Sequence, residues 1–358
     1  MKASKSSFRY PVLSLLVTAL LLFAAACGNH ANNTGNTNNS TNSSAAPNDS
    51  GATDAAQEQQ VSVVTSFYPL YFLASEIGGE HVNAVNLVSA GVEPHDWTPK
   101  SRDLDTASNA QLFLYHGAGL EGWVDDFLKG MSKDSMVISK EMSVGINLIE
   151  GSGEVTDEHA DENNQGHADE NNHGHADEEA HNHEEGIDPH TWVSPKSALV
   201  LAENIKNSLI EVDSANQADY ENNYSALKQK LEALDADYTA KLAQVTNKNI
   251  VVSHQAFGYL ARDYGLNQVP IMGLIPDAEP RAQDLLKIAK FAKENNVKYI
   301  FFEELVSDQL ANTLASEADA KTMVLNPLEG LTPEQEKAGE NYITLMERNL
   351  QNLVQALQ

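Results

Sequence analysis

From Val61 onward, short runs of β-branched and aromatic residues alternate with stretches whose apolar residues recur at helical spacing. In the first half, the expected strands are 61–67, 82–89, 111–117 and 135–139. The expected helices between them are 70–77, 99–109 and 121–128, and Thr98-Pro99 predicts one helix start because proline fits the first helical position. Strands that alternate with helices pair in parallel, so this order predicts a parallel sheet covered by helices.

The second half of the chain follows the same plan. Its expected strands are 249–253, 268–272, 298–302 and 322–325, and its expected helices are 256–264, 280–294, 308–317 and 334–356. No residue-level repeat relates the two halves, so only the architecture is duplicated. We therefore expect an α/β protein with two lobes, each a parallel sheet covered by helices.

A long helical region separates the halves. Ser194-Pro195 predicts its start, residues 198–210 have helical spacing, and 215–245 continue that spacing over some 30 residues. Such a helix spans roughly 45 Å at 1.5 Å per residue, which predicts a rigid strut along both lobes. The expected boundaries are an N-terminal lobe at 61–193, linking helices at 194–246 and a C-terminal lobe at 247–358.

The first 26 residues are expected to be a signal peptide. Positive residues precede an apolar run at 12–26 that is too short for a standard membrane-spanning helix. Three alanines then precede Cys27, which resembles the lipobox of bacterial lipoproteins and predicts a lipid on Cys27. An ordinary secretory signal cleaved near Ala26 is the alternative. Residues 27–60 are rich in Asn, Ser, Thr and Ala, which predicts a disordered tether.

Charge and cysteine content exclude several classes of protein. The formal net charge is −28, which is unsuited to binding nucleic acid or anionic lipid through Lys and Arg. One cysteine excludes an internal disulfide framework, a four-cysteine zinc site and a protein-ligated iron–sulfur cluster. The chain also lacks a Gly-x-Gly-x-x-Gly turn and a Walker loop, which argues against nucleotide binding. Its twelve histidines point to nitrogen and oxygen ligands for any metal.

Four loops carry side chains that bind metals. Three of them, 91–97, 253–257 and 326–330, follow expected strands, and 188–192 precedes the helix start at Ser194. Ligands of open α/β sheets bind at the carboxyl ends of strands. The candidate metal ligands are His95, His190, His254 and Glu329. Three imidazoles and one carboxylate form a four-coordinate set suited to Zn²⁺. Because these ligands must be deprotonated, we expect metal binding to weaken as pH falls through the histidine range.

Other titratable residues leave alternatives open. Glu303 or Glu304 is the alternative carboxylate ligand, and we expect one of them to accept the other ring proton of a ligating histidine. His81 and His116 are not expected to bind metal, and His30 lies in the tether.

The motifs around these residues make the interpretation more specific. Pro-His occurs at 94–95 and 189–190, Ser-His-Gln-Ala-Phe-Gly-Tyr at 253–259 and Asn-Pro-Leu-Glu at 326–329. Over about 61–358, the chain resembles the zinc-binding solute-binding lipoproteins of ABC metal importers, the group that contains streptococcal adhesin-type and laminin-binding lipoproteins. The resemblance implies two (β/α)4 lobes joined by a long helix, with metal between them on His95, His190, His254 and Glu329.

The same resemblance implies a function and a place in the cell. We expect a monomer that is anchored to the bacterial membrane through Cys27. It would capture Zn²⁺ outside the cytoplasm and deliver it to a membrane permease with its ATPase. No nucleic-acid partner is expected.

Three other functions are alternatives. Manganese-binding relatives resemble a two-histidine, two-carboxylate arrangement, whereas three histidines favour zinc. A zinc hydrolase would need an open coordination position, for example with Glu303 as the base if Glu329 is not a ligand. The chain has no His-Glu-x-x-His motif, and four protein ligands favour binding, so we do not expect an enzyme. Nothing in the residues independently supports a host-binding adhesin.

A histidine-rich insert precedes the second Pro-His motif. Residues 154–185 contain six histidines and twelve acidic residues but no Lys or Arg, and His-Ala-Asp-Glu recurs every eight residues. The histidines are His159, His167, His173, His175, His181 and His183. This composition predicts a mobile loop over 154–186 that binds divalent metal weakly and passes Zn²⁺ inward. A solvated acidic spacer is the alternative.

Overall fold

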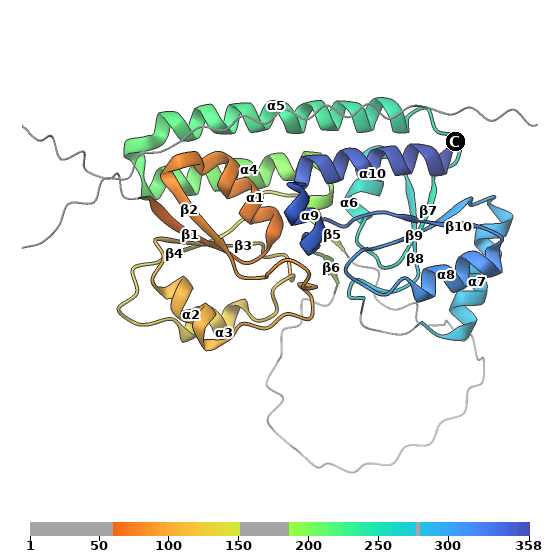
Figure 1. The fold of residues 1–358 in the computed structure, drawn as a ribbon, viewed down its shortest axis with the longest axis horizontal. Helices are drawn as coiled ribbons and strands as arrows, with labels where there is room; N and C mark the ends of the chain where they lie inside the picture. Colours follow the sequence, from red (N-terminus) through yellow and green to blue (C-terminus); the bar gives the residue numbers. More distant parts are fainter. Residues whose placement is uncertain (1–59, 151–185, 277–279) are drawn as a thin grey trace, which may run out of the picture. The chain divides into compact units, whose positions relative to one another are not determined.

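The computed structural model describes residues 60–150, 186–276 and 280–358 (Figure 1). The expected signal peptide, the tether up to residue 59 and the histidine-rich insert lie outside the described residues. Across the described ranges, none of the helices has the length and apolar character needed to cross a membrane.

The first half forms a four-stranded parallel sheet in the order β2-β1-β3-β4. Its strands are β1 (Val61–Thr65), β2 (Val82–Asn86), β3 (Leu112–Tyr115) and β4 (Ile138–Glu141). Helix α1 (Tyr68–Gly78) covers one face, and α2 (Ser101–Ser108) and α3 (Val124–Gly130) cover the other (Figure 1). Neighbouring β1 residues accordingly belong to different cores, Val63 with α1 and Val64 with α2 and α3.

The second half repeats this topology in the order β10-β9-β7-β8, all parallel. Its strands are β7 (Asn249–Val252), β8 (Asn267–Pro270), β9 (Tyr299–Phe302) and β10 (Lys321–Val324). Its helices are α6 (Gly258–Tyr264), α7 (Ala282–Glu294), α8 (Gln309–Ala318), α9 (Pro333–Ala338) and α10 (Tyr342–Leu357). In each sheet, the strand that comes first in the chain lies between the second and the third. The α/β prediction of two helix-covered parallel sheets is confirmed.

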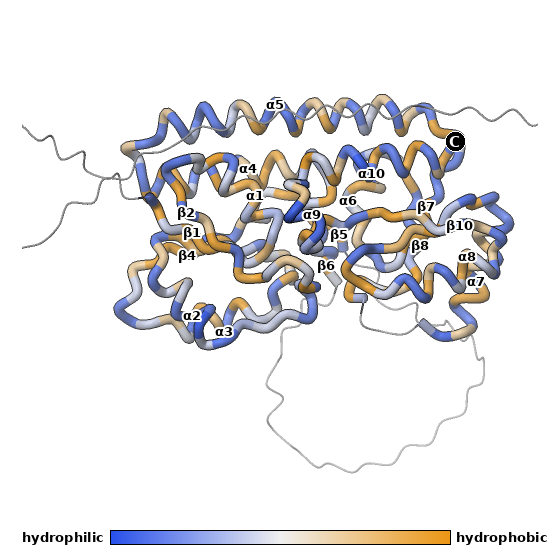
Figure 2. The backbone as a smooth tube through the Cα atoms, in the orientation of Figure 1, coloured by the Kyte–Doolittle hydropathy of each residue, from blue (hydrophilic) through white to orange (hydrophobic). Residues whose placement is uncertain are grey.

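Two helices link the lobes, α4 (Pro195–Val212) and α5 (Gln217–Leu242). With 26 residues, α5 is about 39 Å long, and it packs against α1 and α4 and also against α6 and α10. From Leu227 onward its buried residues recur every three to four positions, and Figure 2 shows hydrophobic segments between hydrophilic ones along the helix. The helix therefore runs beside both lobes, as its apolar spacing predicts. The expected lobe boundaries at residues 193 and 246 stay predictions.

Three sequence predictions about local structure were wrong. The expected helix 334–356 is two helices, α9 and α10, because Gly339 adopts a left-handed φ of 73° and Asn341 caps α10 by accepting a hydrogen bond from Thr344 N. The helix expected from Thr98-Pro99 begins only at Ser101. The helix expected from residue 121 begins at Val124, since the Glu121 carboxylate instead accepts hydrogen bonds from backbone N–H groups before it.

A short hairpin was not predicted at all. Strands β5 (Ile149–Glu150) and β6 (Ile187–Asp188) pair antiparallel on either side of residues 151–185. The Tyr259 hydroxyl, from α6, donates to the Asp188 carbonyl at 2.6 Å and accepts from Ile149 N at 3.0 Å. The second lobe therefore holds both strands of the hairpin that leads into the second Pro-His motif.

Candidate metal centre

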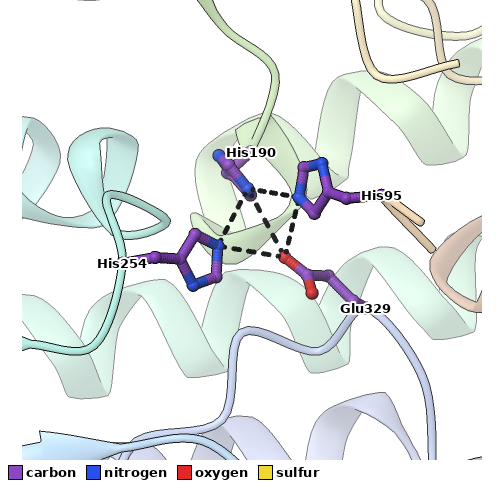
Figure 3. A group of neighbouring side chains, drawn as sticks. All are labelled: His95, His190, His254 and Glu329. Atoms are coloured by element: carbon purple, nitrogen blue, oxygen red, sulfur yellow. Dashed lines mark hydrogen bonds and ion pairs between the residues drawn. The ribbon is translucent and has the colours of Figure 1, made fainter. Parts of the chain in front are cut away.

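The four candidate ligands meet between the lobes (Figure 3). His95 lies in the loop between β2 and α2, and His190 follows β6, so both precede α4 and lie in the first half of residues 61–358. His254 follows β7 and Glu329 follows β10. Each offers one ligand atom, and these atoms all lie within 4.8 Å of one another. The side chains of all four are buried.

The distances in this group suit a tetrahedral ion. The Nε2 atom of His190 lies 3.1 Å from that of His95 and 3.3 Å from that of His254. Glu329 Oε1 lies 3.4–3.5 Å from all three Nε2 atoms. Four ligands around Zn²⁺ at bond lengths of about 2.0–2.1 Å are separated by about 3.3–3.4 Å along the edges of the tetrahedron. Five of the six pairs of donor atoms thus stand near the separation that zinc would require, and the sixth pair, from His95 to His254, lies within 4.8 Å.

A carboxylate orients each of two histidines from behind. Asp188 Oδ1 lies 2.8 Å from His190 Nδ1, and Glu303 Oε1 lies 2.8 Å from His254 Nδ1. A carboxylate accepts the proton of the nitrogen it faces, so Nδ1 carries that proton and Nε2 is directed at the centre of the group. Glu303 was one of two residues expected to orient a histidine in this way, whereas Asp188 was not expected. The signal for Asp188 was its position two residues before His190 in the Asp-Pro-His motif.

Glu304 has a different role from its neighbour. Its Oε2 accepts hydrogen bonds at 2.7 Å from Asn326 Nδ2 and from Gln335 Nε2. Asn326 begins the loop that carries Glu329, and its Oδ1 accepts from Leu328 N at 2.6 Å. The structure therefore brings Glu329 into the group of four and places Glu304 in the support of its loop.

In the absence of metal, the pKa values of the four residues are shifted from their ordinary values. Burial alone would lower the pKa of His254, but the charge and hydrogen bond of Glu303, aided by Glu329, raise it to about 10. The pKa of His190 is also raised, because Asp188 and Glu329 outweigh burial. Burial holds the pKa of His95 below its ordinary value. The three imidazoles outweigh burial at Glu329 and hold its pKa well below the usual range.

Glu329 supplies a direct indication of a cation site. Its Oε1 is buried and accepts no hydrogen bond, although three imidazole nitrogens face it. A buried ionised oxygen needs a positive partner, which protonated His254 supplies in the metal-free protein and a metal ion would supply in its place. Three imidazole nitrogens and one carboxylate oxygen at these separations provide the donor chemistry of zinc.

Glu93 is a further acidic residue near the site, and it was not among the predicted site residues. It lies two residues before His95, and its Oε2 accepts a hydrogen bond from Asp96 N at 3.1 Å. Burial and the nearby Glu329 charge raise the pKa of Glu93 to about 7. The loop that carries His95 therefore holds a second carboxyl group close to the Glu329 carboxylate.

The other histidines in the described residues are outside the group. His116 is buried, its Nε2 lies 2.9 Å from the Pro189 carbonyl oxygen, and burial lowers its pKa to about 3, so it is neutral. His81 lies 3.0 Å from Asp219. The predicted lipidation site Cys27 and the accessory set lie outside the described residues, as does His30 of the tether. The accessory set is His159, His167, His173, His175, His181 and His183.

Comparison with known proteins identifies the family. Residues 63–356 match the family model of the periplasmic component A of the zinc-uptake complex. The chain belongs to this family. The family expected from the Pro-His, Ser-His and Asn-Pro-Leu-Glu motifs is thereby confirmed.

Two curated members of this family differ in length. The chain is 40% identical over 306 residues to the zinc-binding protein AdcA of Streptococcus pyogenes, covering 84% of this chain but only 57% of that protein. It is 39% identical over 342 residues to the high-affinity zinc uptake system protein ZnuA of Bacillus subtilis, covering 96% of both chains. The chain thus spans little more than half of AdcA but nearly the whole of the ZnuA relative.

Solved structures of the family share the fold. The Zn(II)-bound ZnuA-like domain of Streptococcus pneumoniae AdcA has a TM-score of 0.67 and 37% identity, covering 83% of this chain and 99% of that domain. The laminin-binding protein Lmb of Streptococcus agalactiae, described as having adhesin and metal-transporting activity, has a TM-score of 0.70 and 31% identity. That match covers 84% of this chain and 100% of Lmb.

Proposed function

We propose that this protein captures one Zn²⁺ between its two lobes, outside the cytoplasm, and delivers it to an ABC permease for uptake. The observation that carries this proposal is the buried group of His95, His190, His254 and Glu329, whose donor atoms lie within 4.8 Å of one another. Relatives named for zinc binding and zinc uptake support the choice of metal. A lipid on Cys27, a monomeric state and the permease are parts of the same proposal.

The donor chemistry favours zinc over manganese. Three imidazole nitrogens and one carboxylate suit Zn²⁺, whereas Mn²⁺ prefers oxygen-rich sites. In this mechanism, Asp188 and Glu303 hold the Nδ1 protons of His190 and His254, so that Nε2 faces the ion and the proton displaced by zinc is the one on Nε2. Glu329 supplies the negative charge. Burial excludes water as a competing ligand.

The arrangement favours binding over catalysis. A catalytic zinc site keeps a coordination position for water and a base beside it, whereas here four protein donors converge within 4.8 Å of one another. The alternative base, Glu303, directs Oε1 at the Nδ1 atom of His254, behind the ring. Glu303 is therefore engaged in orienting a ligand. We propose a carrier of zinc that is not an enzyme.

Metal counting tests this function. Metal is removed from the full-length protein and from a variant that lacks residues 154–185. Each protein is then incubated with equimolar Zn²⁺ and Mn²⁺ and dialysed, and the metal atoms bound per chain are counted. We expect one zinc to remain in the deletion variant, to be lost in His254→Ala and to be kept in the matched control His81→Ala. Retained manganese would overturn the choice of metal. Absence of metal from the deletion variant would overturn the four-residue site.

The accessory histidines receive a separate test. We propose that the insert at 154–185 collects Zn²⁺ for the buried site, because its histidines and acids attract divalent cations. Cells with the deletion should then accumulate zinc more slowly under zinc starvation, and normally when zinc is plentiful. Equal uptake in starved cells would favour the acidic-spacer alternative.

A further inference from the structure

One hydrogen bond joins the segments that carry His190 and Glu329. Trp192 is fully buried two residues after His190, and its indole Nε1 donates to the Pro327 carbonyl oxygen at 2.7 Å. Pro327 in turn lies two residues before Glu329. The bond therefore connects a ligand from the first half of the chain to a ligand from the second.

The tryptophan itself is held on both sides. Its ring packs edge-on against Phe67 at 4.7 Å and against His116 at 5.0 Å between ring centroids. Both neighbours lie at the ends of first-lobe strands, Phe67 after β1 and His116 after β3. The Tyr342 hydroxyl, from α10 of the second lobe, donates to the Trp192 carbonyl at 2.5 Å. Trp192 thus has fixed partners in both lobes.

The Glu329 loop depends on such outside support. Leu328 adopts a left-handed φ of 63°, a conformation that is unfavourable for a branched side chain. Its N–H is held by Asn326 Oδ1 at 2.6 Å, and Asn326 is held by two hydrogen bonds to Asn349 of α10. Two hydrogen bonds tie this loop to the part of the chain before α4: the bond from Trp192 reaches Pro327, before Glu329, and Gly91 N donates to the Leu331 carbonyl oxygen at 2.8 Å, after it. The Trp192 bond is the one beside the strained Leu328.

We propose that Trp192 is a positioning residue that keeps His190 and Glu329 in one geometry, so that both ligands hold the zinc or release it together. This inference rests on the proposed zinc site. While the indole bond is intact, Glu329 Oε1 stays 3.4 Å from His190 Nε2. Once it breaks, the loop loses one restraint on Leu328, and Glu329 can withdraw from the ion. The hydrogen bond therefore acts mainly on the rate of zinc release.

The test is Trp192→Phe, which keeps an aromatic ring between Phe67 and His116 but removes the N–H group. The control is Trp123→Phe, which makes the same chemical change at a tryptophan that packs against Phe127 of α3. Zinc release into excess chelator is followed by stopped flow. We expect release to be about tenfold faster or more in Trp192→Phe, with an association rate near that of the wild type, and both rates to be unchanged in Trp123→Phe. Equal release rates in the two variants would overturn the proposal.

A second measurement does not require zinc. In the metal-free protein, hydrogen exchange of the peptide that contains residues 326–331 should be faster in Trp192→Phe than in Trp123→Phe, while other peptides are unchanged. Faster exchange throughout the chain would indicate a purely structural role and contradict the proposal. Because this result is independent of metal, failure of the coupling is distinguishable from failure of the zinc site.

A third variant covers the case in which Trp192→Phe does not fold. Tyr342→Phe removes the hydroxyl that holds the Trp192 carbonyl and leaves the indole in place. We expect it to speed zinc release and local exchange in the same direction but less strongly. No change in either quantity, with Trp192→Phe unfolded, would overturn the proposal.

Discussion

Gly258 leaves the space that Asp188 occupies. A Cβ atom on Gly258 would stand 2.3 Å from Asp188 Oδ2, whose carboxylate is fully buried and orients His190 through its other oxygen. Gly258 belongs to the Ser-His-Gln-Ala-Phe-Gly-Tyr motif, which also carries His254. This motif of the second lobe thus supplies the candidate ligand His254. Through Gly258, it also leaves space for Asp188, which orients the candidate ligand His190.

The first prediction concerns this close contact. Gly258→Ala forces Asp188 away from Gly258, which displaces the His190 ring. We expect zinc affinity to fall by about tenfold or more and the free energy of unfolding to fall by about 1–3 kcal/mol. Chelator competition and chemical unfolding measure the two effects. Gly122→Ala is the control, since no atom lies within 4 Å of its added Cβ. Wild-type affinity in Gly258→Ala would show that Asp188 does not orient His190.

The second prediction concerns Glu303. Glu303→Gln keeps the shape of the side chain, but its amide can donate to His254 Nδ1 and so favour the tautomer with a proton on Nε2. That proton would face the metal, so we expect zinc affinity to fall by about 10–100-fold. Competition with a fluorescent chelator, corrected at each pH for the proton that His254 loses on binding, measures the affinity. The exposed Glu317→Gln is the control. A change of less than twofold would mean that the contact with His254 is not needed for binding.

The sequence predicted the candidate ligands better than their supports. His95, His254 and Glu329 each follow a strand of a parallel sheet, so their convergence could be expected from topology and motifs. The sequence could not decide whether Glu329 or Glu303 is the ligand, because the two residues follow neighbouring strands, β10 and β9. Only the path of each loop in three dimensions shows which carboxylate joins the three histidines.

Other features had no periodic signal in the sequence. Strands β5 and β6 have two residues each and are separated by 36 positions, so no alternation of polar and apolar residues could reveal them. The Trp192 bond ends on a backbone carbonyl, which any residue at position 327 would offer. Gly339 could have indicated the end of a helix, because glycine readily adopts the left-handed conformation found there. Apolar residues at helical spacing on both sides of it instead predicted one continuous helix.

The third prediction is the pH dependence of stability in the metal-free protein. His254 has a folded-state pKa of about 10 against an ordinary value of 6.5. Its contribution to the free energy of unfolding is therefore complete below pH 6.5 and is lost as pH rises towards 10. Glu329 has a depressed pKa, so its contribution is present above about pH 4.5 and is lost as pH falls. These two groups therefore favour the folded state most between about pH 4.5 and 6.5.

Chemical unfolding in the presence of a chelator checks this window. We expect the free energy of unfolding to fall between pH 6.5 and 9 by up to about 1.4 kcal/mol per pH unit relative to His254→Gln, which lacks the titrating group. Parallel pH profiles for the two proteins would contradict the raised pKa of His254.

The fourth prediction follows from the same protonation state. Between pH 6.5 and 10, metal-free His254 carries a proton that zinc must displace, because Nε2 cannot bind metal and hydrogen together. Zinc affinity should therefore rise about tenfold per pH unit between pH 7 and 9, beyond the range in which an ordinary histidine titrates. Binding at pH 7 should release about one proton from this residue.

Calorimetry in buffers of different ionisation enthalpy measures that release directly. Glu303→Gln is a useful companion, because removing the carboxylate lowers the pKa of His254 and should reduce both the proton release and the slope of affinity against pH. The matched Glu317→Gln variant should behave as the wild type. If affinity, corrected for the chelator's own protonation, were the same at pH 7 and 9, then His254 would already be neutral in the metal-free protein, and Glu303 would orient the ring without charging it.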